Sequence, residues 1–210
     1  ETPKQDRVIF THRGQNQDFS LKDIPSKLPN SNYYFSGFGG DGFHTQMKII
    51  QKLNQQRSNS FIGYNPSFYA IKQHGEEIST NLKHIDILIF NKEEAELLTH
   101  ESGIKNNLLL LSSLGPKYII ITDGSKGSYG INSESCEIVY LETPKDAIIV
   151  DTTGAGDCYA GTCFYFLTKQ YSIKQAMELA TINANYLIRQ KGSSNGSLTL
   201  HELKKKKYNL

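Results

Sequence analysis

The residues best suited to chemistry lie in the segment Asp151-Thr-Thr-Gly-Ala-Gly-Asp157, directly after a predicted strand at Ile148–Val150 and directly before a predicted helix. Gly154, Ala155 and Gly156 carry little or no side chain, so an anion can approach their backbone N–H groups closely. Those groups lie at the start of the predicted helix, where unpaired donors and the positive end of the helix dipole favour negative charge. The segment therefore predicts a phosphate-binding turn.

Asp157 adds a carboxylate to the first turn of that helix, where it is expected to remain ionised. A negative charge beside an anion site is unfavourable unless it has a task, and accepting the proton of an attacking hydroxyl is such a task in phosphoryl transfer. The alternative is a glycine-rich turn in which Asp157 only stabilises the start of the helix.

Two further segments follow predicted strands. Asn91-Lys-Glu-Glu94 comes after Ile85–Phe90, and its first residue can cap a helix that extends through Thr99. Thr122-Asp-Gly124-Ser-Lys-Gly127 comes after the buried run Tyr118–Thr122. Two glycines at the end of a strand permit close approach of backbone to a ribose or phosphate, although they also form ordinary turns.

Taken together and in this order, the three segments resemble the motifs of the ribokinase/PfkB family of carbohydrate kinases. Residues 151–157, followed by a small residue at Gly161, resemble the C-terminal signature of the family. Asn91–Glu94 resembles its N-x-x-E motif and Thr122–Gly127 its T-x-G-x-x-G nucleotide loop. One departure is Thr162, where the family usually has Ala or Gly.

The resemblance implies a role for each matching residue. Asp157 is implied as the catalytic base, with Gly154, Ala155 and Gly156 as the anion hole for the transferred phosphoryl group. ATP and Mg²⁺ are the implied cofactors, with K⁺ as a further candidate. The residues implied to hold them are Asn91, Glu94 (to Mg²⁺ through water), Thr122, Gly124, Gly127, Asn183, and Asp151 with Thr153 (for the monovalent cation). One carboxylate plus waters is a typical arrangement for Mg²⁺, which keeps much of its hydration.

The implied activity is ATP-dependent phosphorylation of a sugar hydroxyl. A nucleoside of the adenosine type is the nearest alternative acceptor, since the same core serves it. A non-catalytic relative that binds nucleotide or sugar as a regulator is the alternative from another class, although such a protein does not need Asp157 as a base. A homodimer is a further expectation, because lids in this family often pair between subunits.

The order of strands and helices predicts a parallel α/β sheet with right-handed crossovers. The resemblance specifies a three-layer α/β/α fold of the ribokinase type. It further implies that residues 1–15 are a remnant of the lid strands and 16–210 a partial nucleotide-binding and catalytic core, with the N-terminal strands and most of the lid missing. Other family-like features are Asn65-Pro66 and the Gly192-Ser-Ser loop.

The remaining predicted elements complete this alternation. Strands are expected at Arg7–His12, Tyr33–Ser36, Ser60–Tyr64, Ser128–Asn132 and Glu137–Glu142, the last two antiparallel around a polar turn. Helices are expected at Asp41–Gln56, Ile104–Leu114, Gly156–Leu167, Ser172–Arg189 and Leu198–Tyr208.

One motif points to a different class of enzyme. Gly37-Phe-Gly39-Gly-Asp-Gly42 satisfies the GxGxxG pattern of dinucleotide-binding dehydrogenases. That fingerprint also requires an acidic residue at the end of the next strand to hold the ribose, and here the strand ends in Tyr64-Asn65-Pro66. NAD binding is therefore disfavoured, and the resemblance to the carbohydrate kinases implies that the segment borders the sugar site.

Composition excludes several other classes. The 23 Lys and Arg against 21 Asp and Glu give a net charge of +2, too weak a field for a dedicated nucleic-acid binder. No apolar run approaches the ~18 residues that a membrane span needs. An odd count of 3 cysteines without a CxxC pair predicts reduced thiols and a cytoplasmic protein.

Overall fold

The computed structural model describes residues 19–56, 60–144 and 148–207. Within them, a sheet of six strands runs in the order β1-β2-β3-β4-β5-β6. Strands β1 to β4 are parallel to one another, whereas β5 is antiparallel to both of its neighbours, β4 and β6. The strands are β1 (Tyr33–Ser36), β2 (Ile62–Asn65), β3 (Ile87–Asn91), β4 (Tyr118–Thr122), β5 (Ser128–Asn132) and β6 (Glu137–Leu141). The predicted parallel α/β sheet is confirmed, together with its antiparallel end.

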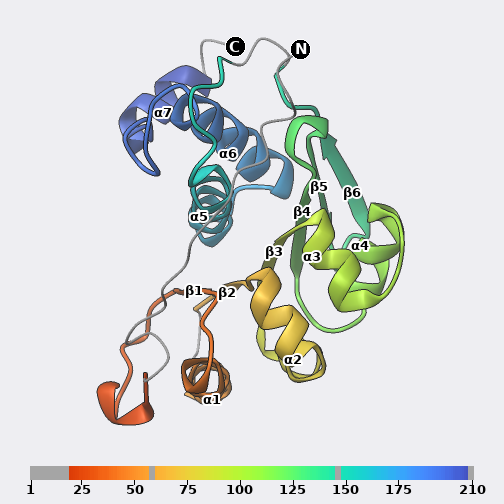
Figure 1. Ribbon diagram of the computed structural model, residues 1–210, viewed down its shortest axis with the longest axis vertical. Coiled ribbons are helices and arrows are strands. Elements are labelled where there is room, and N and C mark those ends of the chain that lie inside the picture. Colours follow the sequence, from red (N-terminus) through yellow and green to blue (C-terminus); the bar gives the residue numbers. More distant parts are fainter. Residues whose placement is uncertain (1–18, 57–59, 145–147, 208–210) are drawn as a thin grey trace.

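The helices form two layers, one on each face of the sheet (Figure 1). One layer holds α1 (Asp41–Gln56), α2 (Phe68–Asn81), α3 (Lys92–Thr99) and α4 (Ile104–Ser112), and the other holds α5 (Ala155–Thr168), α6 (Ile173–Leu187) and α7 (Leu200–Lys207). Short 3₁₀ turns lie at Leu21–Asp23, Leu82–His84 and Gly124–Lys126.

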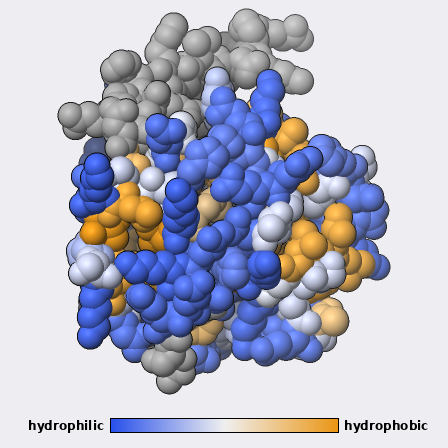
Figure 2. All heavy atoms as spheres, turned by 90° about the horizontal axis from the view of Figure 1, so that it is seen from below, coloured by the Kyte–Doolittle hydropathy of each residue, from blue (hydrophilic) through white to orange (hydrophobic). Residues whose placement is uncertain are grey.

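The alternation of side chains along β3 explains why both faces are covered. Leu88 and Phe90 pack in the core beneath α1 to α4, whereas Ile87 and Ile89 pack beneath α5 and α6. All four are buried, as a strand between two helical layers requires. Seen from below, the surface is mostly hydrophilic, with hydrophobic side chains confined to separate patches (Figure 2).

Most predicted boundaries are confirmed to within a few residues, and the local signals act as expected. Asn91 caps α3 by accepting a hydrogen bond from the Glu94 N–H at 2.8 Å, while the Glu94 carboxylate accepts from the Asn91 N–H at 2.9 Å. Ser172 and Gln175 form the same reciprocal box at the start of α6. The predicted strand Arg7–His12 and the proposed lid remnant 1–15 lie outside the described residues.

Helix α2 was not predicted. Ser67 caps it by accepting a hydrogen bond from the Ala70 N–H at 3.2 Å, and Ala70, Ile71 and Ile78 supply its buried side. The helix is kinked at His74, whose backbone is non-helical at φ −137° and ψ 27°. Between Ile71 and Ile78 the sequence has no large apolar side chain and includes Gly75, so the apolar periodicity on which a helix prediction depends is interrupted there.

The predicted strand at Ile148–Val150 is wrong. These three side chains are 63%, 64% and 59% exposed, and the segment does not join the sheet. Instead, the N–H groups of Val150 and Asp151 donate to the carbonyl of Ile188, at 2.8 and 3.1 Å. The segment therefore runs along the C-terminal end of α6, where its β-branched side chains have no sheet to pack on.

Candidate active site

The turn that precedes α5 is fixed by Gly154 and Asp151. Gly154 is in the left-handed region at φ 81°, and a Cβ built there would lie 2.3 Å from the carbonyl oxygen of Ser193. The Asp151 carboxylate accepts hydrogen bonds from the Thr153 N–H at 2.9 Å and the Gly192 N–H at 3.0 Å. The turn is thus bound to the loop that follows α6, and only glycine fits at its apex.

The backbone N–H groups available at the start of α5 lie slightly later in the chain than predicted. The Ala155 N–H donates to the carbonyl of Thr152 at 3.2 Å, so this amide is already engaged. The next two amides, of Gly156 and Asp157, belong to the first turn of α5, whose N–H groups have no intrahelical acceptor. A Cβ built on Gly156 would meet nothing within 4 Å, so the backbone there faces open space.

The ends of the parallel strands meet beside this turn. Strand pairing places Ser36 opposite Asn65 and Asn91 opposite Thr122. All four residues line one cavity of about 440 Å³, which we call the polar pocket. The predicted site residues that it brings together are Asn91, Glu94, Thr122, Gly154, Gly156 and Asp157.

Glu94 is the second carboxylate of the polar pocket. It accepts hydrogen bonds from the N–H groups of Asn91 at 2.9 Å and Phe68 at 3.0 Å. Burial raises the pKa of Glu94, and the negative charges of Glu93 and Asp157 raise it further, against the effect of the two backbone donors. The pocket therefore holds Asp157 and a partly desolvated carboxylate that repel each other.

A second cavity of about 550 Å³, the glycine-loop pocket, lies on the other side of the turn. Thr122, Thr152 and Gly156 line both cavities. The other predicted residues in this pocket are Gly124, Gly127 and Ala155. The open backbone at Gly156 therefore marks the junction between the two pockets.

The glycine loop itself owes its shape to its two glycines. Gly124 and Gly127 have φ values of 54° and 102°. A Cβ on Gly127 would lie 2.1 Å from the carbonyl oxygen of Leu141, whereas one on Gly124 would meet nothing within 4 Å. The Thr143 hydroxyl donates to the Gly124 carbonyl at 2.9 Å, and so fixes the loop to the segment after β6.

Asn183 does not line the glycine-loop pocket, contrary to what the resemblance implied. Its buried amide donates to the Thr162 hydroxyl at 2.9 Å and accepts from the Leu198 N–H at 2.8 Å. Thr162, the position that departs from the family pattern, is therefore used as a partner for Asn183. Helix α6 instead presents Thr181, Ala184, Asn185 and Ile188 to the pocket.

Sequence reasoning missed the α6 residues because the phase of a helix cannot be read from a single polar residue. Asn185 is the most polar of them, and its side-chain oxygen is buried and accepts no hydrogen bond within the described residues. The two strand ends Ser36 and Asn65 were also missed as pocket residues. Their signal was available, since the C-terminal ends of parallel strands form the usual ligand site of an α/β sheet.

The donor set of the polar pocket fits a hydrated divalent cation. Both Glu94 oxygens already accept one backbone N–H, so each retains a lone pair for a water molecule but the group is not free to enclose an ion. Mg²⁺ held through water matches that geometry, and its charge would relieve the repulsion from Asp157. For Asp151 and Thr153 the described contact is the loop hydrogen bond, and their role toward a monovalent cation stays a prediction.

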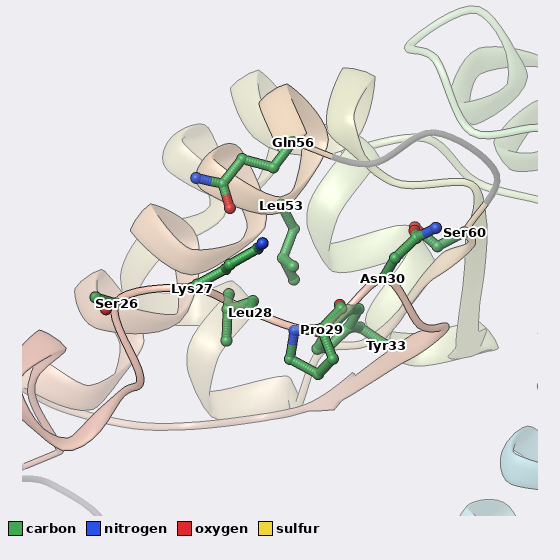
Figure 3. A pocket seen from close by; sticks show the side chains of 9 residues that line it. All are labelled: Ser26, Lys27, Leu28, Pro29, Asn30, Tyr33, Leu53, Gln56 and Ser60. Carbon is green, nitrogen blue, oxygen red and sulfur yellow. The ribbon is translucent and has the colours of Figure 1, made fainter.

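Another cavity, of about 490 Å³, lies where the chain before β1 meets the C-terminal end of α1 (Figure 3). Lys27, Leu28 and Tyr33 line it from one side and Leu53 and Gln56 from α1. It contains none of the predicted site residues, so it is not part of the candidate active site.

The fold and the paired pockets define an α/β protein in which the glycine-rich turn before α5 adjoins two cavities. The pfkB family carbohydrate kinase model matches residues 1–200, and the chain belongs to this family. Within the described residues, no helix is long and apolar enough to cross a membrane.

Three known proteins illustrate the similarity. The ATP-dependent 6-phosphofructokinase of Thermoanaerobacterium thermosaccharolyticum is 30% identical over 135 residues, covering 62% of this chain and 41% of that protein. The cytidine kinase of Thermococcus kodakarensis is 25% identical over 149 residues, covering 70% and 52%. The crystal structure of a fructokinase from Vibrio cholerae O395, with fructose, ADP and calcium ion bound, superimposes with a TM-score of 0.74 at 20% identity, covering 90% of this chain and 64% of that one. The chain thus spans about half the length of the curated relatives that it matches.

Proposed function

We propose that the protein phosphorylates a sugar hydroxyl with ATP. The observation that carries this proposal is the position of Gly156 and Asp157 at the start of α5, where the glycine-loop pocket and the polar pocket meet. A donor nucleotide in one pocket and an acceptor alcohol in the other would react at that junction. In-line transfer needs base, oxygen and phosphorus in a row, which two adjoining cavities can provide.

In this arrangement the glycine-loop pocket holds the nucleoside of ATP against Gly124, Gly127 and α6. The γ-phosphoryl group reaches the free amides of Gly156 and Asp157, which stabilise the negative charge of its oxygens. The acceptor hydroxyl lies in the polar pocket beside the Asp157 carboxylate. Its oxygen bonds to the γ-phosphorus, the bond to ADP breaks, and the proton passes to Asp157.

Bound Mg²⁺ would neutralise the phosphate charge during this transfer. The residues of the chain that would hold it are Glu94, through water, and Asn91, which shares the capping box with it. Burial, with smaller contributions from the charges of Glu93 and Asp157, raises the pKa of Glu94, and a bound cation would offset these effects because it favours the ionised carboxylate.

A sugar is favoured as acceptor by the size and lining of the polar pocket. The pocket has a volume of about 440 Å³, and polar side chains line it at the strand ends, Ser36 and Asn65, and at the start of α2, Ser67. The related 6-phosphofructokinase and the solved fructokinase both act in sugar chemistry according to their names. A nucleoside is the second candidate, on the similarity to a cytidine kinase.

The variant Asp157→Asn tests the proposal. It keeps the size of the side chain but removes the proton acceptor, so kcat in a coupled ADP assay should fall about 10²–10⁴-fold. ATP affinity should be kept or rise slightly, because a negative charge beside the γ-phosphate is removed. The matched control is Glu202→Gln, which changes an acidic residue in the first turn of α7 and should leave kcat unchanged.

The alternatives give different results in the same measurements. A regulator would bind ATP but release no ADP with any sugar or nucleoside in the parent protein. If Asp157 only stabilised the helix, its replacement would lower stability by about 1 kcal/mol and leave kcat per folded molecule unchanged. An unchanged kcat in Asp157→Asn would refute the mechanism.

A further inference from the structure

Three potential metal ligands meet between α1 and α2, outside the candidate active site. The Nδ1 atom of His44 lies 3.1 Å from the Oε2 atom of Glu77. One ligand atom each of His44, His74 and Glu77 lies within 4.8 Å of the other two. Within the described residues this is the only such group of three histidine, cysteine or acidic side chains.

The His74 ring is held in place by its surroundings. It stacks on the fully buried Phe43 ring, with centroids 4.2 Å apart and planes 8° from parallel. The non-helical backbone at this residue, which kinks α2, accompanies that placement. The ring of His44 lies edge-on to it, with centroids 5.1 Å apart. The His74 imidazole is thus oriented before any ligand arrives, which lowers the entropic cost of binding.

The charge and the accessibility of the group also suit a metal ion. The Glu77 carboxylate supplies a negative charge beside both rings, and His44 and Glu77 are 48% and 39% exposed, so an ion can reach them from solvent.

We propose that His44, His74 and Glu77 form a binding site for a divalent transition-metal ion of the zinc type. Two imidazoles and a carboxylate are a common ligand set for Zn²⁺, which completes its tetrahedron with water. Tetrahedral ligands at the usual bond lengths of about 2.0–2.2 Å lie about 3.3 Å from each other. The ligand atoms of His44 and Glu77 are already close to that spacing, and rotation of these two exposed side chains can bring them to the same distance from His74.

The position of this site connects it to the two helices that begin at the polar pocket. Gly37 and Ser67, which line the pocket, precede α1 and α2, and each metal-binding histidine follows one of them by seven residues. His44 lies in the first turn of α1 and His74 about two turns into α2, so an ion at the site would join the N-terminal halves of the two helices. The proposed ion is thus a link between helices and takes no part in phosphoryl transfer.

Zinc titration of the tag-free protein tests the proposal without any measurement of activity. Calorimetry should show one Zn²⁺ per chain at this site. With Zn²⁺ at about 100 times its dissociation constant, Tm should rise by about 5–10 °C. Co²⁺ in place of Zn²⁺ should give the visible absorption bands of a tetrahedral complex, whereas Mg²⁺ should have no such effect because it prefers oxygen ligands.

Two variants identify the ligands. His44→Gln and Glu77→Gln change exposed side chains, so both should fold with the Tm of the parent protein without zinc, and both should lose the zinc-induced rise. Glu76→Gln, on the same helix, and His201→Gln, on α7, are the matched controls and should keep it.

Each contrary result overturns the assignment. Absence of Zn²⁺ binding in the parent would show that His44 and Glu77 form an ion pair only. Binding that survives both ligand variants but is lost in Glu94→Gln would place the ion in the active site. If a ligand variant and Glu76→Gln lost the zinc-induced rise in Tm equally, the zinc would be bound diffusely at the surface.

Discussion

Gly156 and Gly154 are two residues apart in the same turn, yet the structure predicts opposite consequences of giving each a side chain. A Cβ at Gly156 would meet nothing within 4 Å, and its backbone is not in the left-handed region. A Cβ at Gly154 would lie 2.3 Å from the Ser193 carbonyl oxygen, on a residue at φ 81°. The first change affects the site and the second affects the fold.

Gly156→Val should therefore fold normally and fail in catalysis. Its side chain would extend into the junction of the two pockets, where the transferred phosphoryl group must lie against the Gly156 amide. Loss of one preorganised donor to a developing charge costs about 10²–10³-fold in kcat. A coupled ADP assay gives kcat, and a thermal melt of the same sample gives the stability.

Gly154→Ala should show the reverse pattern. Holding a non-glycine residue in the left-handed region costs about 1–2 kcal/mol, and the close approach to a backbone carbonyl adds to this. The unfolding free energy should fall by at least that amount, measured by urea denaturation. Near-normal turnover in Gly156→Val, with Gly154→Ala no less stable than the parent, would refute both the anion-hole assignment and the geometry of the turn.

Two further outcomes follow from the polar contacts. Asn183→Ala removes the hydrogen bonds to Thr162 and Leu198, so we expect the unfolding free energy to fall by about 1–3 kcal/mol with the ATP Kd unchanged. Weaker ATP binding at equal stability would show instead that Asn183 contacts the nucleotide. The raised pKa of Glu94 means that this carboxyl group holds its proton more tightly in the folded than in the unfolded protein. Its contribution to the unfolding free energy should therefore be full below the ordinary pKa of 4.5 and decline as the pH rises through the raised pKa. Comparison with Glu94→Gln by denaturation at several pH values checks this, and identical pH profiles would contradict it.

The fold was predictable wherever burial acts on both sides of a strand. Strand β4 and helix α1 have the predicted bounds. In a three-layer fold, a continuous apolar run is stable as a strand buried on both faces, and an apolar period of 3.6 residues is stable as a helix with one buried face. Ile148–Val150 shows the limit of this rule. An apolar β-branched run looks like a buried strand in the sequence, but here the segment bonds to Ile188 at the end of α6 and remains exposed.

The candidate site was predictable in its backbone motifs and less so in its side chains. The turn and the nucleotide loop were predictable because glycine is required where the backbone is left-handed and crowded, as it is at Gly154 and Gly127. The face of a helix is harder to derive, because a rotation of one residue by 100° decides whether it points to a ligand or to the core. Asn183 faces Thr162 and Leu198, whereas Asn185, two residues later, faces the pocket.

Three individually weak motifs specify one site because of the sheet that connects them. Asn91 and Thr122 are far apart in the sequence but directly paired at the ends of β3 and β4, and parallel strands bring all such ends to the same edge. The turn before α5 reaches that edge from the opposite helical layer, bound through Asp151 to the loop after α6. Each motif alone could be an ordinary cap or turn. A one-residue slip of β3 against β4 would move Asn91 out of line with Thr122 and turn each side chain of β3 to the opposite face of the sheet, so the register of the strands is part of what builds the pocket.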